Sequence, residues 1–451
     1  MATSKLLYFI KTISLALFAT LMLSSAKNKS EQPNFIFIYA DDLGYGDLGC
    51  YGNPTIKTPN LDLMASKGVK FTQFYVASPV CTPSRAALMT GCYPKRVGLH
   101  KGVLFPASTT GLNPKEITIA DMLKKKGYHT ACVGKWHLGH QAEFLPVSNG
   151  FDHFFGMPFS NDMSKKEQLK YGRKNYKYQL PVMSGKDTLE LDPDQTQICK
   201  RLTKDAVSFI KKNKKNPFFL YMAHPMPHIP VYASEDFQGK SVRGEYGDAV
   251  EEMDWSVGQI INTLKKLKLD KNTIVVFSSD NGPWLPFKTH GGSAGPLRNG
   301  KGTTWEGGMR EPCIMWWPGK IPEGKVCTKV TSTMDILPTF ATFANAKLPA
   351  GLKIDGTDIS DLLLNPDKKL NEERPFFYYA KMGEIEGVRL GAWKYKKNKG
   401  VDELYNIEED ISEKYNLASE NEDKVTELKK LMLDFDEKMD AEAREVGSIK
   451  K

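Results

Sequence analysis

The chain has 451 residues, of which 41% are hydrophobic and 25% are charged, as in ordinary globular proteins. Its net charge is +9, but the lysines are scattered and form no stripe, so the charge does not indicate a nucleic-acid partner. The sequence contains no internal repeat and no low-complexity tract, which excludes a repeat protein.

The first 26 residues have the pattern of a cleaved signal peptide. Lys5 and Lys11 precede the apolar run TISLALFATLML, and Ser24-Ser25-Ala26 provides a small-residue cleavage site. The run is too short to cross a bilayer comfortably, and no cysteine follows it that a lipid could modify. We therefore expect a protein that is exported to the periplasm or secreted, without a stable membrane anchor.

Apolar runs that end in polar clusters predict five buried strands. They are NFIFIYADD (34–42), KFTQFYVAS (70–78), YHTACVGKW (128–136), PFFLYMAHP (217–225) and NTIVVFSSDNG (272–282). Helical patterns lie between them, in residues 113–127, which open with Asn113-Pro114, and in residues 248–269. Strands that alternate with helices predict an α/β fold, a large, mostly parallel, doubly wound sheet flanked by helices. Ligands bind such sheets outside the carboxyl ends of the strands.

The pattern changes after about Thr331. The helical segment MDILPTFATFA is followed by the short apolar runs PFFYYAK, GVRLGAWKYKK and DELYNIEED, which predict an antiparallel sheet. A charged amphipathic helix, residues 422–442, follows them. We expect a signal peptide at 1–26, a catalytic domain at 27–350 and a smaller α+β subdomain at 351–451. The sequence of this subdomain shows no catalytic motif.

Two of the predicted strands end in oxygen-bearing side chains. Asp41 and Asp42 follow the first strand, and Asp280 and Asn281 follow the last. Carboxylates without histidine or thiolate partners favour calcium or magnesium over zinc. Acidic and amide side chains are also common turn formers, but their occurrence at two strand ends favours a metal site.

Cys81 opens the segment CTPSRAALMTG. Pro83 suits the first turn of a helix, so Cys81 is expected at a helix amino terminus, where backbone amides favour an anion, with Arg85 one turn further on. A disulfide and a thiolate nucleophile of lowered pKa are both alternatives. The signal-peptide region contains no cysteine, so the exported chain keeps an odd number, seven, and at least one lies outside any intramolecular disulfide.

Together these motifs resemble the formylglycine-dependent sulfatases. The resemblance covers residues 34–318 and rests on CTPSR with AALMTG, ADDLGYGDLGCYG (40–52), GKWHLG (134–139), SSDNG (278–282) and GPLRNGKGTTWEGGMREP (295–312). With GVLFP and GMPFSND, the last motif is most similar to the branch that contains arylsulfatase A and N-acetylgalactosamine-6-sulfatase. The resemblance implies an alkaline phosphatase-like fold and hydrolysis of a sulfate ester, with a galactose-type or other sulfated carbohydrate as substrate.

The resemblance also implies a modified nucleophile. A formylglycine-generating maturation enzyme would oxidise Cys81 to 3-oxoalanine (formylglycine), whose hydrate attacks sulfur and later releases sulfate as the aldehyde re-forms. One calcium ion would be bound by the side chains of Asp41, Asp42, Asp280 and Asn281 together with the modified Cys81.

The resemblance also implies roles for further residues, according to their positions in the matching motifs. Arg85 would stabilise the charge of the sulfate oxygens, and Lys135, Lys301 and Ser160 would bind sulfate. His137 would orient or deprotonate the hydrate, and His228 would protonate the leaving group, a reaction suited to histidine. Nearby, His224 is the weaker candidate for such a role, and Trp284 is placed to stack against a sugar ring.

Two other hypotheses remain open. A phosphonate or phosphodiester hydrolase shares this fold, although the related two-zinc enzymes use many histidines and this chain has only eight. A non-catalytic protein that binds sulfated glycans, with Cys81 never converted, is the third hypothesis, but a protein that only binds does not need His137 or an activated nucleophile.

Overall fold

The computed structural model describes residues 32–170, 172–368 and 373–449. The proposed signal peptide lies outside these residues. The largest element in the described part is a mixed sheet with the strand order β11-β2-β10-β9-β1-β8-β4-β5-β6-β7, in which β12 also pairs with β2. Its strands are β1 (Asn34–Ala40), β2 (Val69–Tyr75), β4 (His129–Lys135), β5 (His153–Met157), β6 (Pro181–Ser184), β7 (Asp187–Leu191), β8 (Phe218–Ala223), β9 (Thr273–Ser279), β10 (Arg310–Trp316), β11 (Lys325–Cys327) and β12 (Thr331–Ser332).

The centre of the sheet is parallel, as predicted. Strand β1 pairs in parallel with β8 and β9, and β4 pairs in parallel with β8 and β5. Strand β10 lies antiparallel between β2 and β9, and β6 and β7 form an antiparallel edge. All five strands expected from the sequence are present, and the carboxyl ends of β1, β8, β9 and β4 lie along one edge.

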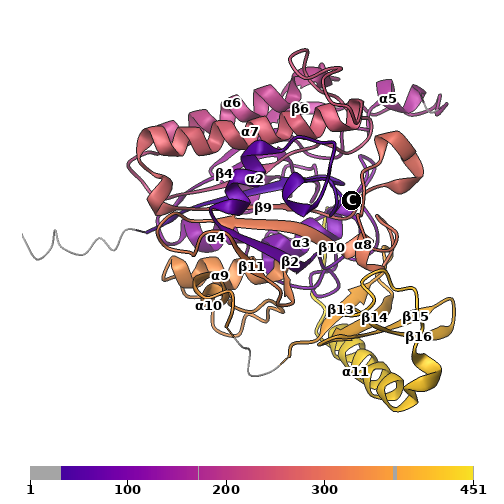
Figure 1. Cartoon of the computed structure of the whole chain (residues 1–451). Coiled ribbons are helices and arrows are strands. Elements are labelled where there is room, and N and C mark those ends of the chain that lie inside the picture. Colours follow the sequence, from indigo (N-terminus) through magenta and orange to yellow (C-terminus); the bar gives the residue numbers. More distant parts are fainter. Residues whose placement is uncertain (1–31, 171, 369–372, 450–451) are drawn as a thin grey trace, which may run out of the picture.

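Helices cover both faces of this sheet (Figure 1). Alternate residues of β1 supply two separate cores, because successive side chains of a strand point to opposite faces. Phe35, Phe37 and Tyr39 pack in the core formed with α3, α4 and α9, whereas Ile36 and Ile38 pack in the core formed with α2, α6 and α7. The helices are α2 (Pro59–Ser66), α3 (Cys81–Thr90), α4 (Ile119–Lys124), α5 (Lys165–Lys170), α6 (Ile198–Lys212), α7 (Glu245–Leu267), α8 (Glu306–Met309), α9 (Ile336–Phe343) and α10 (Ser360–Leu364). The doubly wound arrangement is confirmed.

One helix begins later than predicted. Asn113-Pro114 was expected to open the helix that precedes β4, but α4 begins only at Ile119. Thr118 caps it by accepting a hydrogen bond from the Asp121 amide, and the Asp121 side chain accepts one from the Thr118 amide in return. This reciprocal cap is a stronger start signal than the proline.

The C-terminal part forms the expected antiparallel sheet. Its strands are β13 (Phe376–Tyr379), β14 (Ile385–Leu390), β15 (Trp393–Asn398) and β16 (Val401–Asn406), paired in that order. Helix α11 (Glu422–Ala441) packs on this sheet (Figure 1). The chain then returns to the larger unit, where β17 (Gly447–Ser448) pairs with β3 (Thr110–Gly111). The boundary near residue 350 remains a prediction.

All seven cysteines are unpaired, and six of them are buried. Within the described ranges, no helix combines the length and the apolar character needed to cross a membrane.

Candidate active site

The two acidic strand ends lie next to each other. Because β1 and β9 are parallel, with Ala40 opposite Ser279, the residues that follow them share one edge. The Asp42 amide donates to Asp280 Oδ1 at 3.2 Å, and Asn281 Nδ2 donates to Asp42 Oδ1 at 2.7 Å. Asp41, Asp42, Asp280 and Asn281 are all buried, so the structure brings together the four side chains that the sequence proposed as metal ligands.

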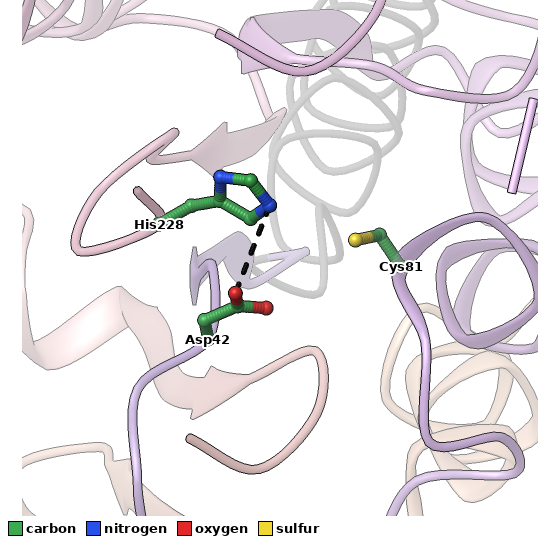
Figure 2. Close-up of side chains that lie close together, drawn as sticks. All are labelled: Asp42, Cys81 and His228. Atoms are coloured by element: carbon green, nitrogen blue, oxygen red, sulfur yellow. Dashed lines mark ion pairs between the residues drawn. The ribbon is translucent and has the colours of Figure 1, made fainter. Parts of the chain in front are cut away.

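Cys81 is the first residue of α3 and points into this cluster. Val80 before it is extended, so the helix starts at the cysteine, as expected. Figure 2 shows its thiol directed toward Asp42 and His228, whose polar atoms lie within 4.8 Å of the sulfur and of each other. Burial raises the pKa of the Cys81 thiol to about 12, although Lys135 and Lys301 oppose the shift. Burial therefore disfavours the thiolate form of the unmodified residue.

The guanidinium of Arg85 is held at the base of the site. Its Nε donates to Asp280 Oδ2 at 2.9 Å, its Nη2 lies 2.8 Å from the same oxygen and 3.6 Å from Asp41 Oδ1, and its Nη1 donates to the Lys135 carbonyl. The side chain is fully buried. This network fixes a positive charge one helical turn beyond Cys81.

Two lysines flank the cysteine. Lys135 Nζ pairs with Asp41 Oδ2 and lies 3.2 Å from Ser160 Oγ. Lys301 Nζ lies 2.7 Å from Asp42 Oδ1 and 3.8 Å from the sulfur of Cys81. Burial alone would lower the pKa of each lysine, but the carboxylates raise it, so both lysines stay charged. Considered without the resemblance, both would have been expected on the solvated surface, and the structure shows that neither is there.

His137 is held in a strained and defined orientation. Its φ of 61° lies in the left-handed region, which non-glycine residues rarely adopt. Nε2 lies 2.8 Å from the Leu104 carbonyl, and Thr82 Oγ1 donates to the His137 carbonyl while accepting from the Leu104 amide. Nδ1 is buried without a partner. Strain of this kind concentrates at functional sites, and Asp42, with φ of 64°, shares it.

His228 lies on the other side of Asp42. Its Nε2 is 3.7 Å from Asp42 Oδ2, and its Nδ1 donates to the Ile229 carbonyl. The ring centre lies 5.6 Å from that of Trp284, whose ring is also 4.4 Å from Lys301 Nζ. His224 is fully buried, neither of its ring nitrogens has a partner, and burial lowers its pKa to about 4. It is a packed, neutral histidine at the end of β8.

The sequence assigned no role to three residues that hold the site together. Thr82 and the Leu104 carbonyl fix His137, and the Tyr221 hydroxyl accepts from Arg85 Nη1 at 3.4 Å. Thr82 lies inside the motif CTPSR, so its position in the sequence could have indicated a role in the site. Leu104 acts through its backbone and Tyr221 is part of a buried strand, so neither could be found from a side-chain pattern.

Comparison with known proteins identifies the family. The family described as Sulfatase matches residues 33–346, and the one described as N-sulphoglucosamine sulphohydrolase, C-terminal, matches residues 300–440. The chain belongs to the sulfatase family. This sulfatase is 41% identical to arylsulfatase A of Bos taurus over 401 residues, which covers 84% of this chain and 76% of the relative. It is 40% identical to N-acetylgalactosamine-6-sulfatase of Canis lupus familiaris over 390 residues, covering 82% and 72%.

A solved structure of high similarity is Ps i-CgsB in complex with k-i-k-neocarrahexaose. It is 34% identical, covers 90% of this chain and 92% of its own, and superimposes with a TM-score of 0.79. The sulfatase described here therefore has the alkaline phosphatase-like fold and is a sulfuric ester hydrolase.

The donor set of this sulfatase fits a hard divalent cation. Oδ1 of Asp41 and Oδ1 of Asn281 are buried without hydrogen-bond partners, and oxygens of Asp41 and Asp280 lie within 4.8 Å of each other and of the Cys81 sulfur. Burial and the charge of Asp41 raise the pKa of Asp280 to about 7. A cation beside this pair would offset the repulsion between the two carboxylates. Oxygen ligands of this kind are those that calcium prefers.

The charges of the site suit an anionic substrate. Three carboxylates are matched by three basic side chains, so a bound divalent ion would leave an excess of positive charge for a sulfate ester. These groups are Asp41, Asp42 and Asp280 on one side and Arg85, Lys135 and Lys301 on the other.

Proposed function

We propose that this sulfatase hydrolyses the sulfate ester of a galactose-type sugar, after a formylglycine-generating enzyme has converted Cys81 to formylglycine. The observation that carries the proposal is the convergence of Cys81 with two pairs of strand-end oxygen ligands, two lysines and a histidine in one buried site. A disulfide at Cys81 would leave this arrangement without purpose, and the structure records Cys81 as unpaired.

The modified cysteine would supply the nucleophile. The hydrate of the aldehyde offers one hydroxyl for attack on sulfur and a second whose deprotonation releases sulfate. The start of α3 supports this role, because the amides of the first helical turn favour a negative charge at that point. His137, fixed through Leu104 and Thr82, would hold the hydrate in orientation and accept its proton.

One calcium ion, bound by Asp41, Asp42, Asp280, Asn281 and the modified Cys81, would stabilise negative charge on the sulfate oxygens. The unpaired oxygens of Asp41 and Asn281 support this assignment. Arg85 keeps Asp41 and Asp280 in place through its guanidinium.

Substrate binding and departure of the alcohol fall to the surrounding side chains. Lys135 and Lys301 would hold sulfate oxygens from two sides, with Ser160 adding a hydroxyl beside Lys135. Such preorganised charges stabilise the transition state more than they would in water. His228 Nε2 faces the same space and would protonate the bridging oxygen as the sugar alcohol leaves.

A carbohydrate substrate is favoured by what the relatives act on and bind. N-acetylgalactosamine-6-sulfatase and a structure complexed with neocarrahexaose both point to sulfated galactose-type sugars. We further propose that the protein is a periplasmic or secreted glycan sulfatase. Its parts would be a signal peptide at 1–26, a catalytic domain at 27–350 and a C-terminal subdomain at 351–451.

The test is release of free sulfate from a panel of sulfated mono- and oligosaccharides, a steroid sulfate, an aryl sulfate, and phosphate mono- and diesters. We expect sulfate release from a galactose-type sugar that Cys81→Ala abolishes, together with the mass of an aldehyde on the Cys81 peptide. Cleavage of phosphodiesters without sulfate release would instead support the phosphohydrolase hypothesis. Glycan binding by a protein whose Cys81 stays a thiol would support the non-catalytic one.

A further inference from the structure

A cavity of about 670 Å³ opens next to the active site. Ile229 and Pro230, which directly follow His228 in the chain, form part of its wall. Phe287 and His290, from the 3-10 helix Leu285–His290, form another part. The volume lies within the range of ordinary ligand sites, about 300–1,000 Å³.

An aromatic surface connects the cavity to the proposed acid. The ring centre of Trp284 lies 5.6 Å from that of His228, and the ring centre of Phe287 lies 4.8 Å from that of Trp284. When the leaving oxygen of a substrate lies at His228, the rest of the substrate extends past Trp284. Beyond Trp284 it reaches Phe287 and the cavity. Aromatic rings with a few polar groups are the usual surface for carbohydrate binding.

The polar groups of the cavity carry both signs of charge. His290 Nε2 lies 3.2 Å from Glu245 Oε2, and both side chains are exposed. Lys170 also lines the cavity, and its charge is compensated, because its Nζ lies 2.8 Å from Glu167 Oε2 and donates to the Tyr232 hydroxyl at 2.8 Å. Asp248 accepts from the amides of Gly239, Lys240 and Ser241, so its charge is already satisfied. This lining lacks the uncompensated positive charge that a second sulfate would need, and it suits a neutral polar ring.

We propose that this cavity binds the unsulfated sugar ring adjacent to the sulfated one, with Phe287 as its stacking surface and the pair of Glu245 and His290 as hydrogen-bonding partners. The proposal rests on the proposed function, because it assumes that the sulfated sugar occupies the site around Cys81. It makes the protein an enzyme of oligosaccharides rather than of isolated sulfated monosaccharides.

The experiment compares kcat/KM for an aryl sulfate, a sulfated monosaccharide and the sulfated tetrasaccharide of the same repeat, in a carrageenan series whose neighbouring ring is neutral and unsulfated. The expected result is a clear preference for a tetrasaccharide in the wild type. Phe287→Ala should lower the ratio of tetrasaccharide to monosaccharide kcat/KM by about tenfold, the value of one aromatic contact. Glu245→Gln tests the same surface without removing an aromatic ring.

The matched control is Tyr415→Ala, which removes an aromatic side chain that is 71% exposed and does not line the cavity. Its ratio should equal that of the wild type. Equal kcat/KM for monosaccharide and tetrasaccharide, with the aryl sulfate still hydrolysed, would overturn the proposal and leave the proposed function intact. Failure to release sulfate from any probe by protein shown to contain formylglycine would overturn both.

Discussion

Lys394 of β15 is fully buried and connects the smaller sheet to the loop that carries Lys301. Its Nζ lies 3.0 Å from Glu306 Oε1 and 2.7 Å from Glu413 Oε1, and it donates to the Thr304 carbonyl at 2.9 Å. Lys394→Met keeps most of the length of the side chain and removes the charge. Glu306 then keeps Arg310 and Arg389 as partners, whereas Glu413 loses its basic partner.

Loss of one partner from a buried ion pair costs about 3–5 kcal/mol, because the remaining charge is left desolvated. We therefore expect Lys394→Met to lower the free energy of unfolding by about 4 kcal/mol. Burial raises the pKa of Glu413 and Lys394 opposes that shift, so the variant should raise this pKa further. A raised folded-state pKa gives stability that is present at low pH and lost as pH rises. The deficit should therefore be smaller in acid than at neutral pH.

Urea unfolding of both proteins measures the effect, as a lower midpoint at an unchanged m-value. Lys397→Met on the same strand is the control, since Lys397 is exposed and its loss should change stability by no more than about 0.5 kcal/mol. Adding Glu413→Gln to Lys394→Met should restore part of the stability by removing the uncompensated charge. The reasoning is refuted if Lys394→Met is as stable as Lys397→Met.

Three further predictions concern the metal site, a helix cap and a buried carboxyl. Addition of calcium to chelator-treated protein should raise the midpoint of thermal unfolding. Asn281→Ala should reduce this rise, and an equal rise in the variant would show that Asn281 is not a calcium ligand. Thr118→Ala should lower the free energy of unfolding by about 1 kcal/mol by removing the cap of α4, which chemical denaturation against Thr55→Ala would measure. Burial raises the pKa of Asp254 to about 6, so the unfolding free energy should fall by about 3 kcal/mol as pH rises through about 4 to 6. The slope should flatten in Asp254→Asn, and an unchanged slope would exclude this carboxyl as its source.

The sequence predicts the sheet and its reactive edge because both follow from local pattern. Strand β1 is apolar on both faces and ends at Ala40, directly before Asp41, so both the burial of the strand and the position of the acids at its carboxyl end can be deduced. The start of α3 at Cys81 follows from Pro83 in the same way. The sequence did not predict that β1 and β9 are neighbours, and it is their parallel pairing in the structure that brings Asp280 beside Asp42.

Contacts between distant segments could not be predicted. The hydrogen bond of His137 uses the backbone of Leu104, and any residue at position 104 has a carbonyl. Lys135 and Lys301 look like surface lysines until folding places each beside a carboxylate. The C-terminal sheet showed no catalytic motif, yet Lys394 holds Thr304, three residues from Lys301, through a contact that spans 90 positions.

The short pairing of β17 with β3 changes how the smaller sheet is attached. The segment that leads into β13 enters this sheet from the larger unit, and the segment after α11 returns to the larger unit, where the Arg444 amide donates to Arg96 and the Ile449 amide to Thr109. In topological terms the smaller sheet is an insertion tethered at both ends rather than an appended tail. The chain entry at β13, the return at β17 and the buried contact of Lys394 with Glu306 make independent unfolding of one unit costly, so the two should melt in one cooperative transition. A variant truncated after residue 445 loses the pairing of β17 with β3 but keeps the contacts of Lys394 with Glu306 and of Arg96 with Glu442, so its transition should stay single while its midpoint falls.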